Sequence, residues 1–282
     1  RSNEPEADVY YNANLAKLSA IVKDIARKHK LTTSDVNSQM SKFMKAAKAK
    51  YGQQYVVGGR DGIHPEANGH FIMAYSFLKS LKLPEKIAEI NIDFQSQKVE
   101  LSQGHKLQSK QFGAQEIKIQ VESSKYPFCF HSRGELKNEN NLLGVLPFID
   151  FQEKFNNFEL KVNNIPTKTV SVRWGTKTKT FTKKELATGI NLADEFIENP
   201  FQSAFLNISN LIYHKQRFET SFVKRSFSGL RAIQGDFTDD KQTMSFIEQI
   251  KKKYINKHAQ ITTDLKRKIK AIDHEIVITL IP

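Results

Sequence analysis

The residues best suited to do chemistry lie in the segment Asp61-Gly62-Ile63-His64-Pro65. A carboxylate three residues before a histidine can accept the imidazole Nδ1 proton, which fixes the tautomer and stabilises an imidazolium formed during reaction. Nε2 of His64 is then free to take the proton of a serine hydroxyl in acyl transfer. Pro65 disfavours helix at His64 and suits the first turn of a following helix, so we expect His64 just outside that helix, facing a cleft. The alternative for Asp61 and His64 is a structural salt link at a helix start.

Other potentially reactive side chains have simpler interpretations. Cys129 lies among aromatic residues, which favours a small buried apolar side chain over a nucleophilic pair with His131. A single cysteine also excludes an intramolecular disulfide framework and a thiolate metal cluster. His70 falls on the helix after Pro65, where a packing or supporting role is favoured over a catalytic one. Ser228 lacks the flanking glycine of a nucleophile elbow.

The longer string from Asp61 to His70, followed by an apolar helix, resembles the C-terminal block of SGNH/GDSL-type hydrolases, which are esterases. The resemblance is most specific over residues 58–81. It extends to about residue 230 through Leu146-Pro147-Phe148, the segment 185–193 and Asn199-Pro200. It implies that Asp61 and His64 are the carboxylate and the base of a Ser-His-Asp triad, which needs no metal and no cofactor. It also implies an ester substrate, in particular an acylated glycan, and a secreted or periplasmic protein.

The sequence departs from this family in one serious respect. The Gly-Asp-Ser block that carries the nucleophile and the Gly-x-Asn-Asp segment that helps form the oxyanion hole are absent, and Gly235-Asp236 is followed by Phe237. We therefore expect the chain to be the C-terminal part of a longer hydrolase, with an upstream fragment supplying the serine and the oxyanion hole. The alternative is a hydrolase-like protein that has lost catalysis and serves as a binding or structural component of an assembly.

Three regions follow one another along the chain. Residues 1–84 are predicted to be the C-terminal part of a three-layer, flavodoxin-like α/β domain, with helices alternating with short strands, one of them at 31–36. Residues 85–181 alternate apolar and polar positions, which predicts an antiparallel, sandwich-like β domain with turns at Asn163-Asn164 and Trp174-Gly175. Residues 182–282 are predicted to be helical with a terminal strand, opening on a capping box at Thr182 and Glu185.

Two apolar helical stripes in the first region, at 15–25 and 71–81, would face solvent without the missing strands. We therefore expect residues 1–83 to pack against another polypeptide.

The chain is strongly basic, with a net charge of +13 and an isoelectric point near 9.6. Lysine and arginine are concentrated at 251–270. Such a stretch could contact nucleic acid, anionic glycans or a membrane surface, although a solvated helix face is the simpler interpretation. Nucleic acid is not favoured as a partner, because the sequence contains no recognisable nucleic-acid-binding module. No run of apolar residues is long enough to predict a membrane span.

Overall fold

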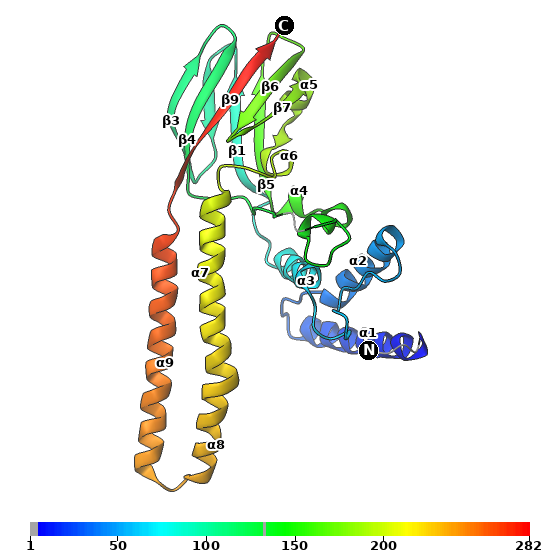
Figure 1. Cartoon of the computed structure of the whole chain (residues 1–282), viewed down its shortest axis with the longest axis vertical. Helices are drawn as coiled ribbons and strands as arrows, with labels where there is room; N and C mark the ends of the chain where they lie inside the picture. Colours follow the sequence, from blue (N-terminus) through cyan, green and yellow to red (C-terminus); the bar gives the residue numbers. More distant parts are fainter. Residues whose placement is uncertain (1–4, 132–133) are drawn as a thin grey trace.

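The computed structural model describes residues 5–131 and 134–282 of the chain. Its architecture is mixed α/β, as expected from the sequence. Figure 1 shows the two β-sheets packed together at one end of the molecule, with three N-terminal helices and a long helical hairpin extending from the same end of the sheets in different directions.

The secondary-structure elements alternate along the chain. The helices are α1 (Pro5–Lys28), α2 (Val36–Tyr51), α3 (Ala67–Ser80), α4 (Phe151–Lys154), α5 (Lys183–Thr188), α6 (Leu192–Glu195), α7 (Gln202–Ser221), α8 (Ser228–Asp236) and α9 (Lys241–Lys268), with short 3-10 helices η1 (Leu142–Gly144) and η2 (Leu146–Phe148) and a π-helical turn η3 (Phe222–Phe227). The strands are β1 (Lys86–Asp93), β2 (Lys98–Leu101), β3 (His105–Phe112), β4 (Glu116–Ser123), β5 (Asn157–Asn163), β6 (Thr169–Trp174), β7 (Lys177–Thr182), β8 (Ile190–Asn191) and β9 (Ile272–Ile281).

The strands form a four-stranded sheet in the order β2-β1-β5-β8 and a five-stranded sheet in the order β3-β4-β9-β6-β7. Strands β1, β4, β5 and β6 bury alternate residues, and the buried side chains of both sheets share one apolar core. The antiparallel expectation is wrong for β1 and β5, which pair in parallel. A parallel pair needs a long crossover, and here the chain passes through β2, β3, β4 and α4 before β5 returns beside β1. The terminal strand β9 lies in the middle of its sheet, between β4 and β6.

A chain of hydrogen bonds runs through this core and joins the two sheets. The indole N–H of Trp174 donates to Nδ1 of His274 at 3.1 Å, so the proton of that imidazole sits on Nε2 and is donated to Ser123 Oγ at 2.8 Å. Ser123 donates in turn to Nδ1 of His105 at 2.8 Å, and His105 donates from Nε2 to the carbonyl of Ile87 at 2.9 Å. The side-chain polar atoms of Trp174, His274, Ser123 and His105 all have partners in this series while both histidines are neutral.

The N-terminal helices lie apart from both sheets (Figure 1). No strand forms at 31–36, because Asp35 caps α2 through a 3.2 Å hydrogen bond from Ser38 N–H to its carboxylate. The apolar stripe of α3 is only partly exposed: Phe71 and Tyr75 are buried in a second apolar core built with residues of the 128–155 segment. The expectation that this stripe needs another polypeptide is therefore wrong for its buried half.

The stripe on α1 is different. Side chains along it are between 37% and 58% exposed: Leu15, Leu18, Ile21, Val22 and Ile25. Within the described residues, then, α1 presents a partly exposed apolar face.

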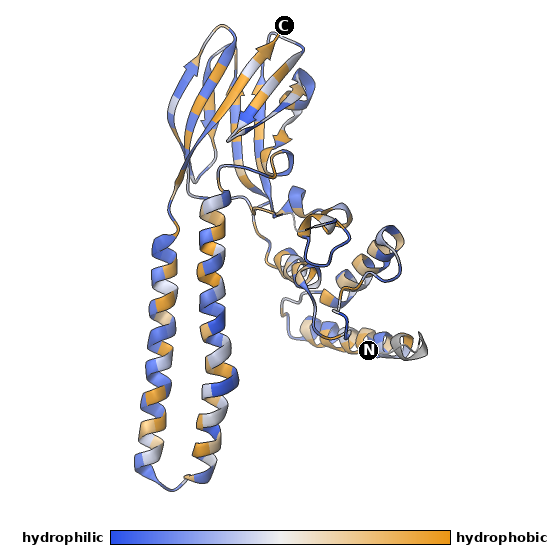
Figure 2. Ribbon diagram, in the orientation of Figure 1, coloured by the Kyte–Doolittle hydropathy of each residue, from blue (hydrophilic) through white to orange (hydrophobic). Residues whose placement is uncertain are grey.

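Helix α7 continues through η3 and α8, and packs against α9 to form the helical hairpin, residues 202–268. The two arms of the hairpin contact each other along one face of α9. The rings of Phe222 and Tyr254 stack there with centroids 4.6 Å apart, and His258 Nε2 lies 2.6 Å from Glu219. Figure 2 shows apolar and polar residues alternating along both arms of the hairpin. None of the described helices is both long and apolar enough to cross a bilayer.

Candidate active site

The Asp61 carboxylate organises the loop between α2 and α3. Its Oδ1 accepts the backbone N–H groups of Ile63 and His64, both at 2.9 Å, which closes a tight turn. Its Oδ2 lies 2.6 Å from Nδ1 of His64. These three hydrogen bonds, above all the one from the imidazole, hold the pKa of Asp61 below its usual value. The carboxylate is therefore ionised wherever the pair could act.

The imidazole of His64 is oriented but otherwise free. Because a carboxylate only accepts hydrogen bonds, Nδ1 carries the proton and Nε2 is the basic nitrogen. The His64 side chain is 83% exposed, and no serine hydroxyl hydrogen-bonds its ring within residues 5–131 and 134–282. The structure thus brings Asp61 and His64 into direct contact and leaves the basic nitrogen of His64 open to solvent.

Two glycines let the loop approach itself closely. Gly59 has a φ of +78°, and a Cβ at this position would lie 1.8 Å from the carbonyl oxygen of His64. A Cβ on Gly69, at the start of α3, would lie 2.1 Å from the carbonyl oxygen of Val57. Larger residues at either position would push the His64 loop away from the helix.

Asn68 fixes the position of this loop through hydrogen bonds, a role that the sequence alone does not predict. The residue is fully buried, donates from its side chain to the carbonyl of Val56 at 2.8 Å, and accepts from the N–H of Gly69. Its backbone N–H donates to the carbonyl of Glu139 at 2.9 Å. The sequence feature that could have identified Asn68 is a polar residue in the first turn of an apolar helix. Such a residue is buried only when its hydrogen bonds are satisfied.

The remaining candidate residues lie outside this loop. His70 is on α3 and exposed. Cys129 is buried and donates to Asn199 Oδ1 at 3.6 Å, and burial raises the pKa of its thiol to about 11, so it is a core residue. His131 instead contacts Gln202, at 3.3 Å. Ser228 begins α8, within the hairpin.

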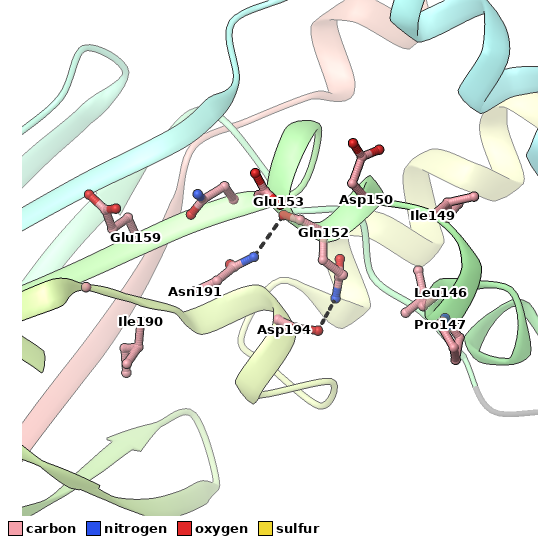
Figure 3. Close-up of a pocket in the computed structure, with 12 residues that line it drawn as sticks. Leu146, Pro147, Ile149, Asp150, Gln152, Glu153, Glu159, Ile190, Asn191 and Asp194 are labelled. Atoms are coloured by element: carbon pink, nitrogen blue, oxygen red, sulfur yellow. Dashed lines mark hydrogen bonds between the residues drawn. The ribbon is translucent and has the colours of Figure 1, made fainter. Parts of the chain in front are cut away.

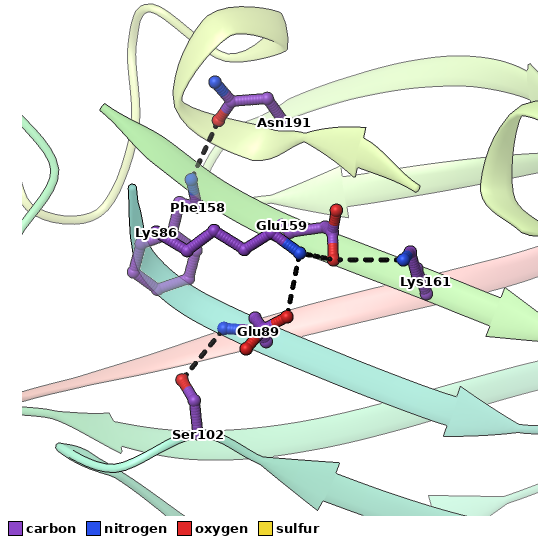
Figure 4. Close-up of polar contacts among 7 residues, drawn as sticks. All are labelled: Lys86, Glu89, Ser102, Phe158, Glu159, Lys161 and Asn191. Carbon is purple, nitrogen blue, oxygen red and sulfur yellow. Dashed lines mark hydrogen bonds and ion pairs between the residues drawn. The ribbon is translucent and has the colours of Figure 1, made fainter. Parts of the chain in front are cut away.

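A pocket of about 530 Å³ lies where α4, β5, β8 and α6 meet (Figure 3). It is lined by Leu146, Pro147, Ile149, Asp150, Gln152, Glu153, Asn157, Glu159, Gly189, Ile190, Asn191 and Asp194. Many of its polar groups already have protein partners: Gln152 donates to Asp194 at 3.0 Å, and Glu159 pairs with Lys86 at 2.9 Å (Figure 4). Asp61 and His64 are not part of this pocket. Among the described residues, no group of three or more His, Cys, Asp or Glu side chains could hold a metal ion.

Comparison with known proteins gives one informative match. No family model matches the chain, and no curated protein matches it. A solved structure described as a gut microbial diltiazem-metabolizing enzyme superposes on 94% of this chain with a TM-score of 0.69. The two share a fold. Their sequences are 18% identical, and this chain spans 66% of the length of that enzyme.

Proposed function

We propose that Asp61 and His64 are the orienting carboxylate and the general base of an SGNH-type serine ester hydrolase. The observation that carries the proposal is the 2.6 Å contact between Asp61 Oδ2 and His64 Nδ1, with the opposite edge of the imidazole open. The fold likeness to a diltiazem-metabolizing enzyme supports an enzymatic function. The resemblance of residues 58–81 to the C-terminal block of SGNH/GDSL-type hydrolases supports the ester class.

In this proposal Nε2 of His64 takes the hydroxyl proton of a serine as the serine oxygen attacks the ester carbonyl. The imidazolium is stabilised by Asp61 and returns the proton to the alkoxide, so the alcohol leaves and an acyl-serine remains. Water then attacks the acyl group, with Nε2 again as the base, and the carboxylic acid is released. Asp61 stays ionised throughout, which agrees with its lowered pKa.

The serine is proposed to lie on a polypeptide that is not in this chain and that packs on α1. The partly exposed apolar stripe of α1 supports this arrangement, because an amphipathic helix normally buries such a face. The proposal includes a flavodoxin-like α/β domain, in which α1 and α3 would flank the missing parallel sheet. A glycan ester is proposed as the substrate, and a secreted or periplasmic location goes with it.

The test is hydrolysis of p-nitrophenyl acetate by the full-length protein that contains this chain. We expect His64→Ala to lower kcat/KM by about 10³-fold or more, and Asp61→Asn by a comparable factor. His70→Ala is the matched control, since it removes an exposed histidine six residues away and should leave kcat/KM within about twofold. Equal activity of the His64→Ala protein and the wild type would remove the basis of the proposal.

A further inference from the structure

A second cleft, of about 600 Å³, lies at the base of the hairpin, where α7 begins and the chain leaves α9 for β9. We call it the hairpin-base cleft. It is lined by Tyr126, Ala204, Asn207, Ile208, Asn210, Leu211, His214, Lys268, Lys270 and Ile272. In Figure 1 this corner lies where the hairpin meets the sheets.

The charge of the cleft is positive and uncompensated. Lys268 and Lys270 stand at its edge, no acidic residue lines it, and neither lysine has an ion-pair partner within the described ranges. The surrounding segment, residues 202–271, contains fourteen lysines and arginines against six acidic residues. This segment therefore accounts for +8 of the net charge of +13. A ligand that carries negative charge is attracted to this corner of the molecule.

The other groups in the cleft suit a sugar ring. The side-chain amides of Asn207 and Asn210 are exposed, make no hydrogen bond within the described part of the chain, and can both donate to and accept from hydroxyl groups. The Tyr126 ring is held in place by its hydroxyl, which donates to the carbonyl of Lys270. Together with Ile208 and Leu211 it offers an apolar wall for the C–H face of a saccharide.

A bilayer surface fits this cleft less well. A bilayer surface is flat and calls for apolar side chains that protrude, whereas the apolar groups here line a concavity. Double-stranded nucleic acid is a second polyanion that two lysines can bind, and DNA is therefore included in the test as a competing ligand.

We propose that the hairpin-base cleft binds a uronic acid unit of an acidic polysaccharide. Lys268 and Lys270 contact the carboxylate, Asn207 and Asn210 contact hydroxyl groups, and Tyr126 packs on the ring. Binding itself does not depend on hydrolysis; only the role of the bound polymer as the substrate rests on the proposed ester hydrolase function.

The experiment is affinity electrophoresis of the intact protein in native gels that contain polygalacturonate. Gels with the same polymer fully methyl-esterified keep the backbone and remove the charge. We expect retardation in the acidic gel alone. Lys268→Gln/Lys270→Gln should weaken the apparent affinity by about fivefold or more, as two charge-assisted contacts are lost.

Two controls distinguish binding at the hairpin-base cleft from non-specific attraction to a basic protein. Lys252→Gln/Lys253→Gln removes the same charge from exposed positions on α9, outside the cleft, and should change the affinity by less than about twofold. Asn207→Ala/Asn210→Ala should weaken binding while leaving the charge unchanged. Equal retardation by the esterified polymer, an equal effect of both lysine pairs, or preferential retardation by double-stranded DNA independent of Lys268 and Lys270 would each overturn the proposal. The His64→Ala protein should bind as the wild type does, so a failure of binding and a failure of catalysis are distinguishable.

Discussion

The indole N–H of Trp174 donates a 3.1 Å hydrogen bond to Nδ1 of His274, which links strands β6 and β9 of the five-stranded sheet. Burial, with a smaller contribution from His105, lowers the pKa of His274 to about 4. A proton on Nδ1 would break the hydrogen bond from Trp174 and place an unpaired charge in the core.

The free energy of unfolding should therefore decrease as pH falls within a defined range. In the unfolded chain His274 titrates near 6.5, whereas in the fold it titrates at about 4. Between these values the unfolded state binds the proton and the folded state does not, so the free energy of unfolding decreases as pH falls through the window, by at most about 3 kcal/mol. Urea unfolding at a series of pH values measures this slope.

The control for this prediction is a second histidine. His274→Phe should reduce the slope between pH 6.5 and about 4, because one titrating group is removed. His29→Gln, at an exposed position at the end of α1, should leave the slope unchanged. A wild-type slope retained in His274→Phe would show that other groups cause the acid sensitivity.

Gly59→Ala should inactivate the site without unfolding the protein. The added methyl group would meet the carbonyl of His64, so the loop must move and the Asp61–His64 pair with it. We expect kcat/KM for p-nitrophenyl acetate to fall by about 10²-fold or more, with a small change in the melting temperature. Gly235→Ala, in α8 with open space around it, is the matched substitution and should leave kcat/KM unchanged. Unaltered activity of Gly59→Ala would contradict a rigid loop.

Val22→Asp tests the proposed partner surface on α1. Val22 is 58% exposed in this chain, so in residues 1–282 alone the change should cost no more than about 0.7 kcal/mol, the range of helix propensity. In the full-length protein, where we propose that another polypeptide covers the stripe, a buried aspartate should cost about 2 kcal/mol or more. Lys17→Asp, at another exposed position of α1, should cost little in either protein. Equal costs of Val22→Asp in both would show that the stripe stays in solvent.

Local features were the most predictable from the sequence. The capping box of Thr182 and Glu185 forms as expected, because it depends only on residues three apart. The turns at Asn164 and Gly175 have φ values of +56° and +65°, which asparagine and glycine tolerate. Asp61 and His64 belong to the same class, since their contact closes within four residues and needs no distant element.

Long-range relationships were not predictable in the same way. The parallel pairing of β1 with β5 depends on a crossover of more than sixty residues, and alternation of apolar residues cannot distinguish parallel from antiparallel neighbours. Burial of Phe71 against Phe128 and Phe151 joins segments far apart in the chain, so a helical stripe alone could not show which partner covers it. The sequence at 31–36 predicts a short strand, but Asp35 caps α2 there, and a cap of this kind competes with strand formation.

The most direct test of the proposed triad is covalent labelling of its nucleophile. The full-length protein would be treated with a fluorophosphonate, which reacts with activated serines, and the labelled peptide identified by mass spectrometry. We predict a single labelled serine outside residues 1–282, with labelling lost in His64→Ala and retained in His70→Ala. Labelling of a serine within residues 1–282, or labelling that persists in His64→Ala, would contradict a triad completed by Asp61 and His64 of this chain.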